Sequence, residues 1–289
     1  MSLRIAVFGP TAVGKSGFAM ALAGEIGGEI VNADAVQLYR GFDAGSAKPA
    51  PAERLLVAHH LIDIADPGME ITVASYQLLA AAAIREIERR GAVPIVSGGS
   101  GLYLRAALGE WDAFGAPPDP EVRRWAEAAP AEEVYLRAVA LDRDAAQRLS
   151  PQDRPRLVRI IERARERRTP AGGPSQRSYI KIGLQLPRED LYARIDQRAI
   201  ELWPHLLEET GRLIARGAAA VSLAERTIGY REALRHLRGE IGHDEGLAQV
   251  QANTRRLARR QLTWWRREPN TIWLRPESGL GQLGPMLRR

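Results

Sequence analysis

A glycine-rich loop near the N-terminus is the first segment whose residue types and spacing could do chemistry. Residues 9–16 read GPTAVGKS, a glycine followed by four residues and then Gly-Lys-Ser. Glycines at these positions let successive backbone N–H groups point toward one anion, and a helix that starts at the loop adds its positive end. Lys15 supplies a mobile cation, and the Ser16 hydroxyl is suited to ligate Mg²⁺. We expect diphosphate or triphosphate binding by Gly9, Pro10, Thr11, Ala12, Val13, Gly14, Lys15 and Ser16; the loop alone does not show whether ATP is the ligand.

Asp34 directly follows the apolar segment 29–33 and is the carboxylate nearest to the phosphate loop among those at the ends of apolar segments. A carboxylate opposite a phosphate loop can ligate magnesium or accept a proton from a nucleophile, and an aspartate in this place can also simply cap a turn. The apolar segment 93–96 ends in SGGSG, without the carboxylate that ATPases usually carry there. The two segments therefore suggest a phosphate site with an acid beside it, of undetermined reaction.

Strands and helices that alternate along the chain are expected to position these residues. The patterns predict strands over 3–8, 29–33 and 93–96, and helices over 17–26, from a Thr72 cap to about 90, and over 102–108. Such alternation is typical of a parallel sheet covered by helices on both faces, with ligands at the carboxyl ends of the strands. Here those ends are residues 9–16, 34–37 and 97–101.

A helical insertion is expected in the middle of the chain. Asp119-Pro120 and Pro130 begin two helices, residues 152–168 form a third, and a loop rich in Gly and Pro over 170–176 closes the region. Strand character returns over 179–186, followed by helices to about 265 and a last strand over 271–274. We expect an α/β fold with a P-loop NTPase-like core (1–112 and 176–289) and an all-helical insertion domain (113–175).

Composition excludes several classes of protein. The 289 residues include no cysteine, which excludes disulfides, thiolate zinc sites and cysteine nucleophiles. No secretory leader and no long uncharged apolar run is evident, so we expect a soluble, cytoplasmic protein that does not enter membranes. The net charge is +6, and only three of the 41 cations are lysines.

A basic segment near the C-terminus could bind RNA. Residues 254–267, TRRLARRQLTWWRR, carry six arginines and no acid. Arg255, Arg256, Arg259 and Arg260 fall on one helical stripe suited to phosphates. The adjacent tryptophans are expected to pack in the core, because aromatic burial is common.

Six blocks of sequence resemble the bacterial tRNA dimethylallyltransferases, in the order that the family has them: DAVQLYR (34–40), GSAKP (45–49), HHLID (59–63), GGSGLY (98–103), IGYRE (228–232) and TRRLARRQ (254–261). This family transfers the dimethylallyl group of dimethylallyl diphosphate, with Mg²⁺, to the N6 amine of the adenine just 3′ of the tRNA anticodon. The resemblance implies a monomer that acts on the anticodon stem-loop. It also suggests that the flipped adenine closes one end of a channel and excludes water.

The resemblance implies roles for individual residues. Asp34 matches the general base that takes the proton of the adenine amine. Lys15, Ser16 with Mg²⁺, and Arg226 match groups that neutralise the departing diphosphate. Ser100 stands where the family usually has threonine and keeps a hydroxyl for the diphosphate or the base, and Gln37 matches a residue that reads the base edge. Contacts with tRNA are implied for Asp34, Ala35, Val36, Gln37, Ser100, Arg123, Arg156, Leu157, Val158, Arg159 and Ile160, beside the arginine stripe.

Other readings remain open at this point. Residues 150–153 are Ser-Pro-Gln-Asp where the family has His-Pro-Asn-Asp, a departure that bears on the tRNA contacts of the insertion. An adenylate isopentenyltransferase acting on free AMP, ADP or ATP would share the diphosphate site without an RNA surface. A small-molecule kinase would share only the phosphate loop, and an RNA-binding module could use that loop merely to hold a nucleotide.

Overall fold

The computed structural model describes residues 3–110, 119–165, 178–277, 281 and 283. The chain divides into two compact units, Met1–Trp111 with Arg177–Arg289, and Asp112–Gln176. The segments that join the units, including the expected loop 170–176, lie outside the described residues, as do residues 166–168 at the end of the third expected insertion helix. Within the described part of the chain no helix is both long and apolar enough to cross a bilayer.

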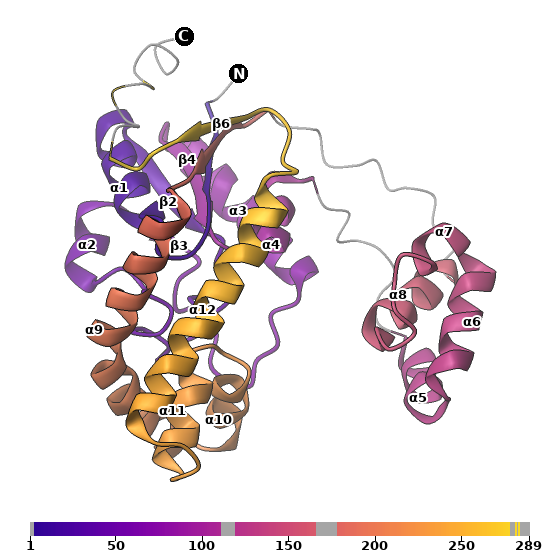
Figure 1. The fold of residues 1–289 in the computed structure, drawn as a ribbon. Coiled ribbons are helices and arrows are strands. Elements are labelled where there is room, and N and C mark those ends of the chain that lie inside the picture. The colour runs from indigo at the N-terminus through magenta and orange to yellow at the C-terminus, as the bar shows by residue number, and fades with distance from the viewer. Residues whose placement is uncertain (1–2, 111–118, 166–177, 278–280, 282, 284–289) are drawn as a thin grey trace. The chain divides into compact units, whose positions relative to one another are not determined.

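A parallel sheet forms the centre of the first unit (Figure 1). Its strands, in the order β3-β2-β4-β1-β5-β6, number six in the part of the chain that the structure describes. Their bounds are β1 Ile5–Phe8, β2 Gly28–Asn32, β3 His59–His60, β4 Val93–Gly98, β5 Ile180–Leu184 and β6 Thr271–Leu274. The predicted α/β fold is confirmed. The sequence pattern missed β3, because a strand of two histidines has no apolar alternation to detect.

Alternate residues of β1 face two separate cores. Ile5 and Val7 pack with α1 (Lys15–Ile26) and the first turns of α9 (Arg188–Ala215), whereas Ala6 and Phe8 pack with α3 (Val73–Arg89) and α4 (Gly101–Leu108). Because successive side chains of a strand point to opposite faces, a fully buried strand must be apolar throughout, as β1 is. Thr72 caps α3 as predicted, since its hydroxyl accepts a hydrogen bond from the Ser75 N–H.

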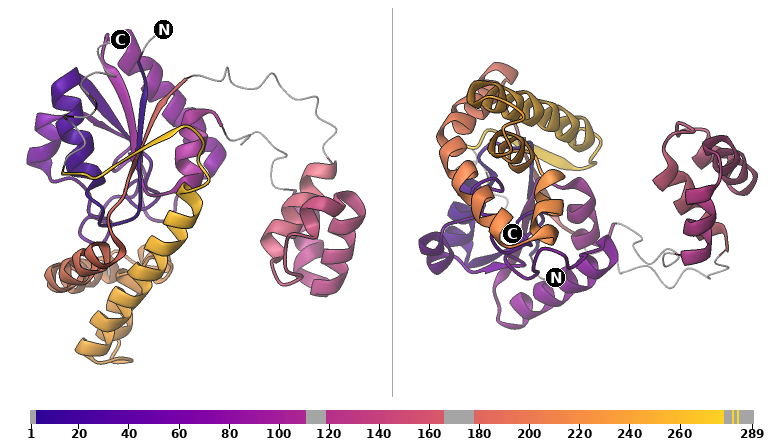
Figure 2. Two further views of the ribbon diagram at one scale, coloured as in Figure 1. Left: turned by 45° about the horizontal axis from the view of Figure 1, so that its top comes forward. Right: turned by 90° about the horizontal axis from the view of Figure 1, so that it is seen from below.

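Four helices lie beyond the carboxyl ends of the strands (Figures 1 and 2). They are α9, α10 (Ala218–Glu225), α11 (Tyr230–Leu237) and α12 (His243–Trp265). Their shared core contains the buried side chains of Trp203, Leu206, Leu213, Tyr230 and Leu234. A short helix, α2 (Pro51–Leu56), precedes β3. This helical layer faces the sheet edge where ligands of parallel sheets bind.

The second unit is a small helical domain with its own core. Its helices are α5 (Pro120–Ala128), α6 (Ala131–Leu141), α7 (Arg143–Ala146) and α8 (Arg154–Arg165). Asp119 caps α5 by accepting hydrogen bonds from the Glu121 and Val122 N–H groups. Val134, Leu157 and Ile161 are fully buried in the core.

The first unit holds together the two points where its chain departs and returns. Lys181 of β5 lies 2.7 Å from the Glu110 carboxylate, just after α4, and also pairs with the buried Glu268. The Tyr179 hydroxyl donates to the Ala107 carbonyl at 3.5 Å. Residues 107–110 and 179–181 are therefore neighbours in space.

Candidate active site

The phosphate loop lies between β1 and α1, as predicted. A Cβ on Gly9 would lie 2.6 Å from the Leu184 carbonyl oxygen, so the neighbouring strand excludes any side chain there. Gly14, the N-cap of α1, has a φ of +100°, which favours glycine. Lys15 and Ser16 therefore begin the helix, where backbone N–H groups and the helix dipole favour an anion.

The Lys15 ammonium is held within this loop. Its Nζ donates a hydrogen bond to the Pro10 carbonyl oxygen at 2.8 Å. Burial lowers the pKa of Lys15 to about 8; the Asp34 carboxylate opposes that shift and the Arg198 guanidinium adds to it. An anion bound beside Lys15 would favour its charged form again.

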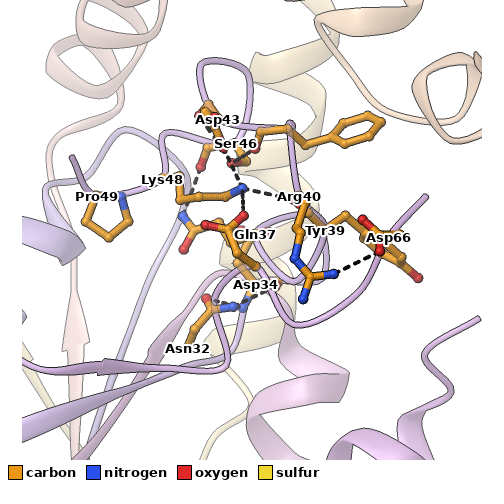
Figure 3. A network of polar contacts seen from close by, with 12 residues as sticks. Asn32, Asp34, Gln37, Tyr39, Arg40, Asp43, Ser46, Lys48, Pro49 and Asp66 are labelled. Carbon is orange, nitrogen blue, oxygen red and sulfur yellow. Dashed lines mark hydrogen bonds and ion pairs between the residues drawn. The ribbon is translucent and has the colours of Figure 1, made fainter. Parts of the chain in front are cut away.

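Asp34 and Gln37 lie in the loop that follows β2 (Figure 3). Asp34 Oδ1 accepts a hydrogen bond from the Val36 N–H at 2.9 Å, and the Asp34 N–H donates to Asn32 Oδ1 at 2.9 Å. The turn role considered from the sequence is therefore present, and it engages one carboxylate oxygen. Gln37 Nε2 donates to the carbonyls of Ser46 and Ala47 at 3.0 and 3.3 Å. Because carbonyls only accept, these bonds fix the orientation of the amide.

Lys48 fixes the loop that faces Gln37 (Figure 3). Its side chain is 1% exposed, and its Nζ donates to the Tyr39 carbonyl and to carboxylate oxygens of Asp43 and Asp63 at 2.9, 2.6 and 2.7 Å. Burial alone would raise the pKa of Asp63, but the bonds from Lys48 and Arg54 outweigh burial and lower it. Asp63 is thus a structural acid of this loop.

A buried carboxylate also fixes the loop that contains Asp43. Glu209 of α9 accepts hydrogen bonds from the Asp43 and Ala44 N–H groups at 2.8 and 3.0 Å, and from the Tyr230 hydroxyl. The Tyr230 hydroxyl oxygen in turn accepts from the Gly45 N–H at 3.0 Å. Sequence reasoning missed Glu209, because an acid in a helix of alternating charges gives no sign that it is buried.

Two arginines complete the surroundings of Asp34 and Lys15. Arg198 of α9 is half-buried; burial lowers its pKa, and the Asp34 carboxylate opposes the change. Sequence reasoning missed it, although the buried Ile195 and Ala199 on the same side of α9 could have marked the inward face. Arg226 ends α10, is exposed, and donates to the Ser222 carbonyl at 3.1 Å.

A cavity of about 600 Å³ brings these groups together. Its lining includes residues of the phosphate loop, of the loop after β2, of the loop after β4 and of the helical layer. Among the site residues it takes in are Thr11, Ala12, Gly14, Lys15, Ser16, Asp34, Val36, Gln37, Gly99, Arg198, Arg226, Arg260 and Gln261. Gly9, Pro10, Val13, Ala35 and Ser100 do not line it; Val13 is fully buried, and Ser100 is the half-buried N-cap of α4.

A second, open cavity of about 890 Å³ adjoins the first and shares Arg226, Ile228 and Arg260 with it. Its arginines are Arg226, Arg231, Arg256, Arg259 and Arg260, which we call the arginine surface. The described residues place no carboxylate in an ion pair with Arg256, Arg259 or Arg260. Arg255, expected in the same stripe, instead pairs with Asp196 of α9.

The tryptophans next to this stripe differ in burial. Trp265 is fully buried and stacks on Phe8 with ring centroids 4.6 Å apart. Trp264 is 38% exposed, and the Arg105 guanidinium lies 5.2 Å from its ring centroid. The expected core packing is confirmed for Trp265 alone.

The insertion arginines meet one buried acid. Glu162 accepts hydrogen bonds from Arg123 Nε at 2.9 Å, from Arg159 Nη1 at 3.0 Å and from the Asp119 N–H at 3.0 Å, with its side chain 1% exposed. Of the remaining expected tRNA contacts, Arg156 pairs with Asp153, Leu157 and Val158 are buried in the core of the second unit, and Ile160 packs partly against it.

The described residues contain no group of three or more His, Asp or Glu side chains that could hold a metal ion. Among the histidines, His60 forms a hydrogen bond between its Nε2 and the Glu29 carboxylate at 2.6 Å. Oxygen donors do occur in the first cavity, where the exposed Ser16 begins α1 and Asp34 lies in the facing loop. Oxygen donors of this kind fit Mg²⁺ held jointly with phosphate oxygens and water.

Comparison with known proteins finds many relatives of this chain. Residues 37–268 match the family of IPP transferases. The chain is 44% identical over 285 residues to a tRNA dimethylallyltransferase of Anaeromyxobacter dehalogenans, covering 94% of each chain. It is 42% identical to tRNA dimethylallyltransferase 1 of Citrifermentans bemidjiense, covering 93% of this chain and 91% of the relative.

Solved structures are similar over nearly the whole chain. The full-length tRNA isopentenylpyrophosphate transferase of Bacillus halodurans matches with a TM-score of 0.72 and 30% identity, covering 100% of this chain and 95% of the other. A eukaryotic dimethylallyltransferase acting on tRNA matches with a TM-score of 0.80 and 23% identity, covering 98% and 76% of the two chains, and shows likeness of fold.

Proposed function

The chain belongs to the IPP transferase family, and from that premise we propose that its first cavity joins a diphosphate site to an adenine site. The chain transfers a dimethylallyl group from dimethylallyl diphosphate to tRNA, as its named relatives do. The acceptor is the N6 amine of the adenine just 3′ of the anticodon. The observation that carries the proposal is that Asp34 and the phosphate loop line one cavity, close enough for the Asp34 carboxylate to shift the pKa of Lys15.

Cations around the phosphate loop would hold the leaving group. Lys15, Arg198 and Arg226 all line the cavity; the first two are half-buried and Arg226 is exposed. Positive groups fixed where charge develops lower the barrier to departure of an anion, most strongly where water is scarce. The Ser16 hydroxyl would hold Mg²⁺, which supplies further neutralisation of the diphosphate.

The loops after β2 would present the adenine. With its Nε2 bonded to two carbonyls, Gln37 keeps Oε1 to accept a hydrogen bond from the N6 amine. N6 forms a bond to C1 of the dimethylallyl group, the C1–O bond to diphosphate breaks with its electron pair, and the N6 proton passes to Asp34. The Asp34 oxygen that is not bonded to the Val36 N–H is the acceptor of that proton.

The arginine surface would bind the RNA backbone beside the cavity. Its Arg226 and Arg260 reach both cavities, so phosphates next to the flipped adenine would meet guanidinium groups that no carboxylate of the described residues neutralises. The insertion domain, residues 113–175, would add contacts through the exposed arginine side chains of the expected set, Arg123, Arg156 and Arg159, whereas Leu157 and Val158 are buried. The protein would act in the cytoplasm as a monomer.

Labelled substrate tests the proposal. The protein is incubated with Mg²⁺ and radiolabelled dimethylallyl diphosphate, in separate reactions with bulk tRNA, AMP and ATP. We expect label in tRNA, at the adenine 3′ of the anticodon after nuclease digestion. Label in AMP or ATP would indicate an adenylate isopentenyltransferase, and phosphate transfer from ATP to a small molecule would indicate a kinase.

A further inference from the structure

Gln261 of α12 joins two loops of the first cavity. Its Oε1 accepts a hydrogen bond from the Thr11 N–H at 2.8 Å, and its Nε2 donates to the Gly99 carbonyl at 2.9 Å. Thr11 belongs to the loop after β1 and Gly99 to the loop after β4, and these strands are paired with Phe8 opposite Gly98. One side chain thus ties the carboxyl ends of two adjacent strands.

The surroundings of this amide suit a glutamine. The Thr11 N–H needs an acceptor and the Gly99 carbonyl needs a donor, and a primary amide offers both without charge. Asparagine offers the same groups on a side chain one methylene shorter. A Cβ on Gly99 would lie 2.7 Å from Gln261 Nε2 and 3.7 Å from Lys15 Nζ. The amide therefore lies close to the ammonium group that would bind diphosphate.

The same helix carries three residues of the arginine surface. Arg259 and Arg260 immediately precede Gln261, and Arg256 lies between one and two turns earlier. Because Gln261 and these arginines belong to one helix, RNA that displaced α12 would also move the amide bonded to Thr11 and Gly99. The helix is thus in contact with both substrate sites of the proposed reaction.

We propose that Gln261 is a positioning residue that fixes the phosphate loop against the loop after β4 and thereby couples diphosphate binding to RNA binding on α12. The inference rests on the proposed function, since it takes the first cavity as a diphosphate site and the arginine surface as an RNA site. Such coupling is reciprocal, so each ligand changes the affinity for the other by the same factor.

Gln261→Leu tests this by removing both hydrogen bonds at similar side-chain size. Calorimetric titration with inorganic diphosphate and Mg²⁺ should show affinity weakened about five- to tenfold. An anticodon stem-loop RNA should bind as tightly as to the wild type, and it should alter diphosphate affinity in the wild type but not in the variant. In transfer assays kcat/KM for dimethylallyl diphosphate should fall by roughly 10- to 100-fold, because small displacements of reacting groups are costly.

Gln251→Leu is the matched control. Gln251 lies on the same helix, outside both cavities, and donates to the Asp196 carbonyl at 3.3 Å. This variant also loses a bond from α12 to a neighbouring backbone, and it should retain wild-type diphosphate affinity and coupling. An equal loss in Gln251→Leu would show a merely structural effect and overturn the proposal.

Further outcomes separate the claims. Wild-type diphosphate affinity in Gln261→Leu would refute the positioning role, and diphosphate affinity that RNA leaves unchanged in the wild type would refute the coupling. Should Gln261→Leu not fold, as judged from its melting curve, Gln261→Glu keeps the acceptor for Thr11 and presents a carboxylate to the Gly99 carbonyl; unchanged affinity there would also overturn the idea. If the wild type puts no label into tRNA, the proposed function fails, whereas the diphosphate titrations still report on Gln261.

Discussion

Raising the pH should deprotonate Lys15 in the enzyme without substrate, and the resulting fall in kcat/KM should identify Lys15 as a diphosphate ligand. Burial lowers its pKa from 10.5 to about 8, so Lys15 loses its proton at a lower pH in the folded protein than in the unfolded chain. A group with a pKa of about 8 is about 90% protonated at pH 7 and about 10% protonated at pH 9, so the charged fraction of the free enzyme falls nearly tenfold. Because bound diphosphate favours the charged form, the pKa of Lys15 should rise in the complex. We expect kcat/KM for dimethylallyl diphosphate to fall nearly tenfold from pH 7 to pH 9, while kcat changes much less.

Two measurements check whether Lys15 causes this fall in kcat/KM, which is the alkaline limb of the pH profile. The chain has three lysines, Lys15, Lys48 and Lys181, so the three side-chain ammonium signals can be assigned in NMR by single Lys→Arg variants and followed through the titration. The Lys15 signal should titrate near pH 8, and it should move upward when inorganic diphosphate is added. In Lys15→Arg the guanidinium stays charged, so the limb of kcat/KM near pH 8 should disappear. A limb that persists in this variant, or a Lys15 signal that titrates near 10.5 without ligand, would refute the reasoning.

Three further predictions follow from the site and from the second unit. Asp34→Asn keeps an oxygen for the turn but not a base, so single-turnover transfer should slow by about 10²- to 10⁴-fold with RNA affinity unchanged; an unchanged rate would remove Asp34 from that role. Replacing Arg256, Arg259 and Arg260 by alanine should reduce the slope of log affinity for tRNA against log salt by about 0.7 to 0.9 for each RNA phosphate that is no longer neutralised, and an unaltered slope would exclude this surface from RNA binding. Glu162→Ala should destabilise residues 119–165 by about 1–3 kcal/mol, seen as faster hydrogen exchange in α5 and α8 but not in the sheet, because the buried acid joins three donors.

The parts of the site that lie next to a strand end could be predicted from the sequence. The glycines of the phosphate loop are required by the backbone itself, at Gly9 by a neighbouring carbonyl and at Gly14 by its φ, so their spacing alone predicted the place of this loop between a strand and a helix. Asp34 follows β2 directly, and carboxyl ends of parallel strands share one edge. Local sequence was enough in both places because the local chain builds the feature.

The residues supplied by the helical layer could not be found in this way. Arg198, Glu209 and Gln261 reach the cavity or its loops from helices more than 150 residues away along the chain, and their roles depend on how α9 and α12 pack on the sheet. The helical period places Arg255 and Arg256 on one stripe, but only packing reveals that Asp196 neutralises the former. Because the chain is rich in arginine, its sequence does not show which guanidinium groups have carboxylate partners.

The ion pair between Glu110 and Lys181 has a consequence for how this architecture could vary. The ion pair joins the chain just before and just after the inserted unit, residues 112–176. The sheet unit therefore holds these two points together whatever sequence the insertion contains. The sheet unit thus tolerates variation at this point of the chain: the inserted segment could lengthen, shrink or be exchanged during evolution while the strands keep their register and the loops at their carboxyl ends keep their places.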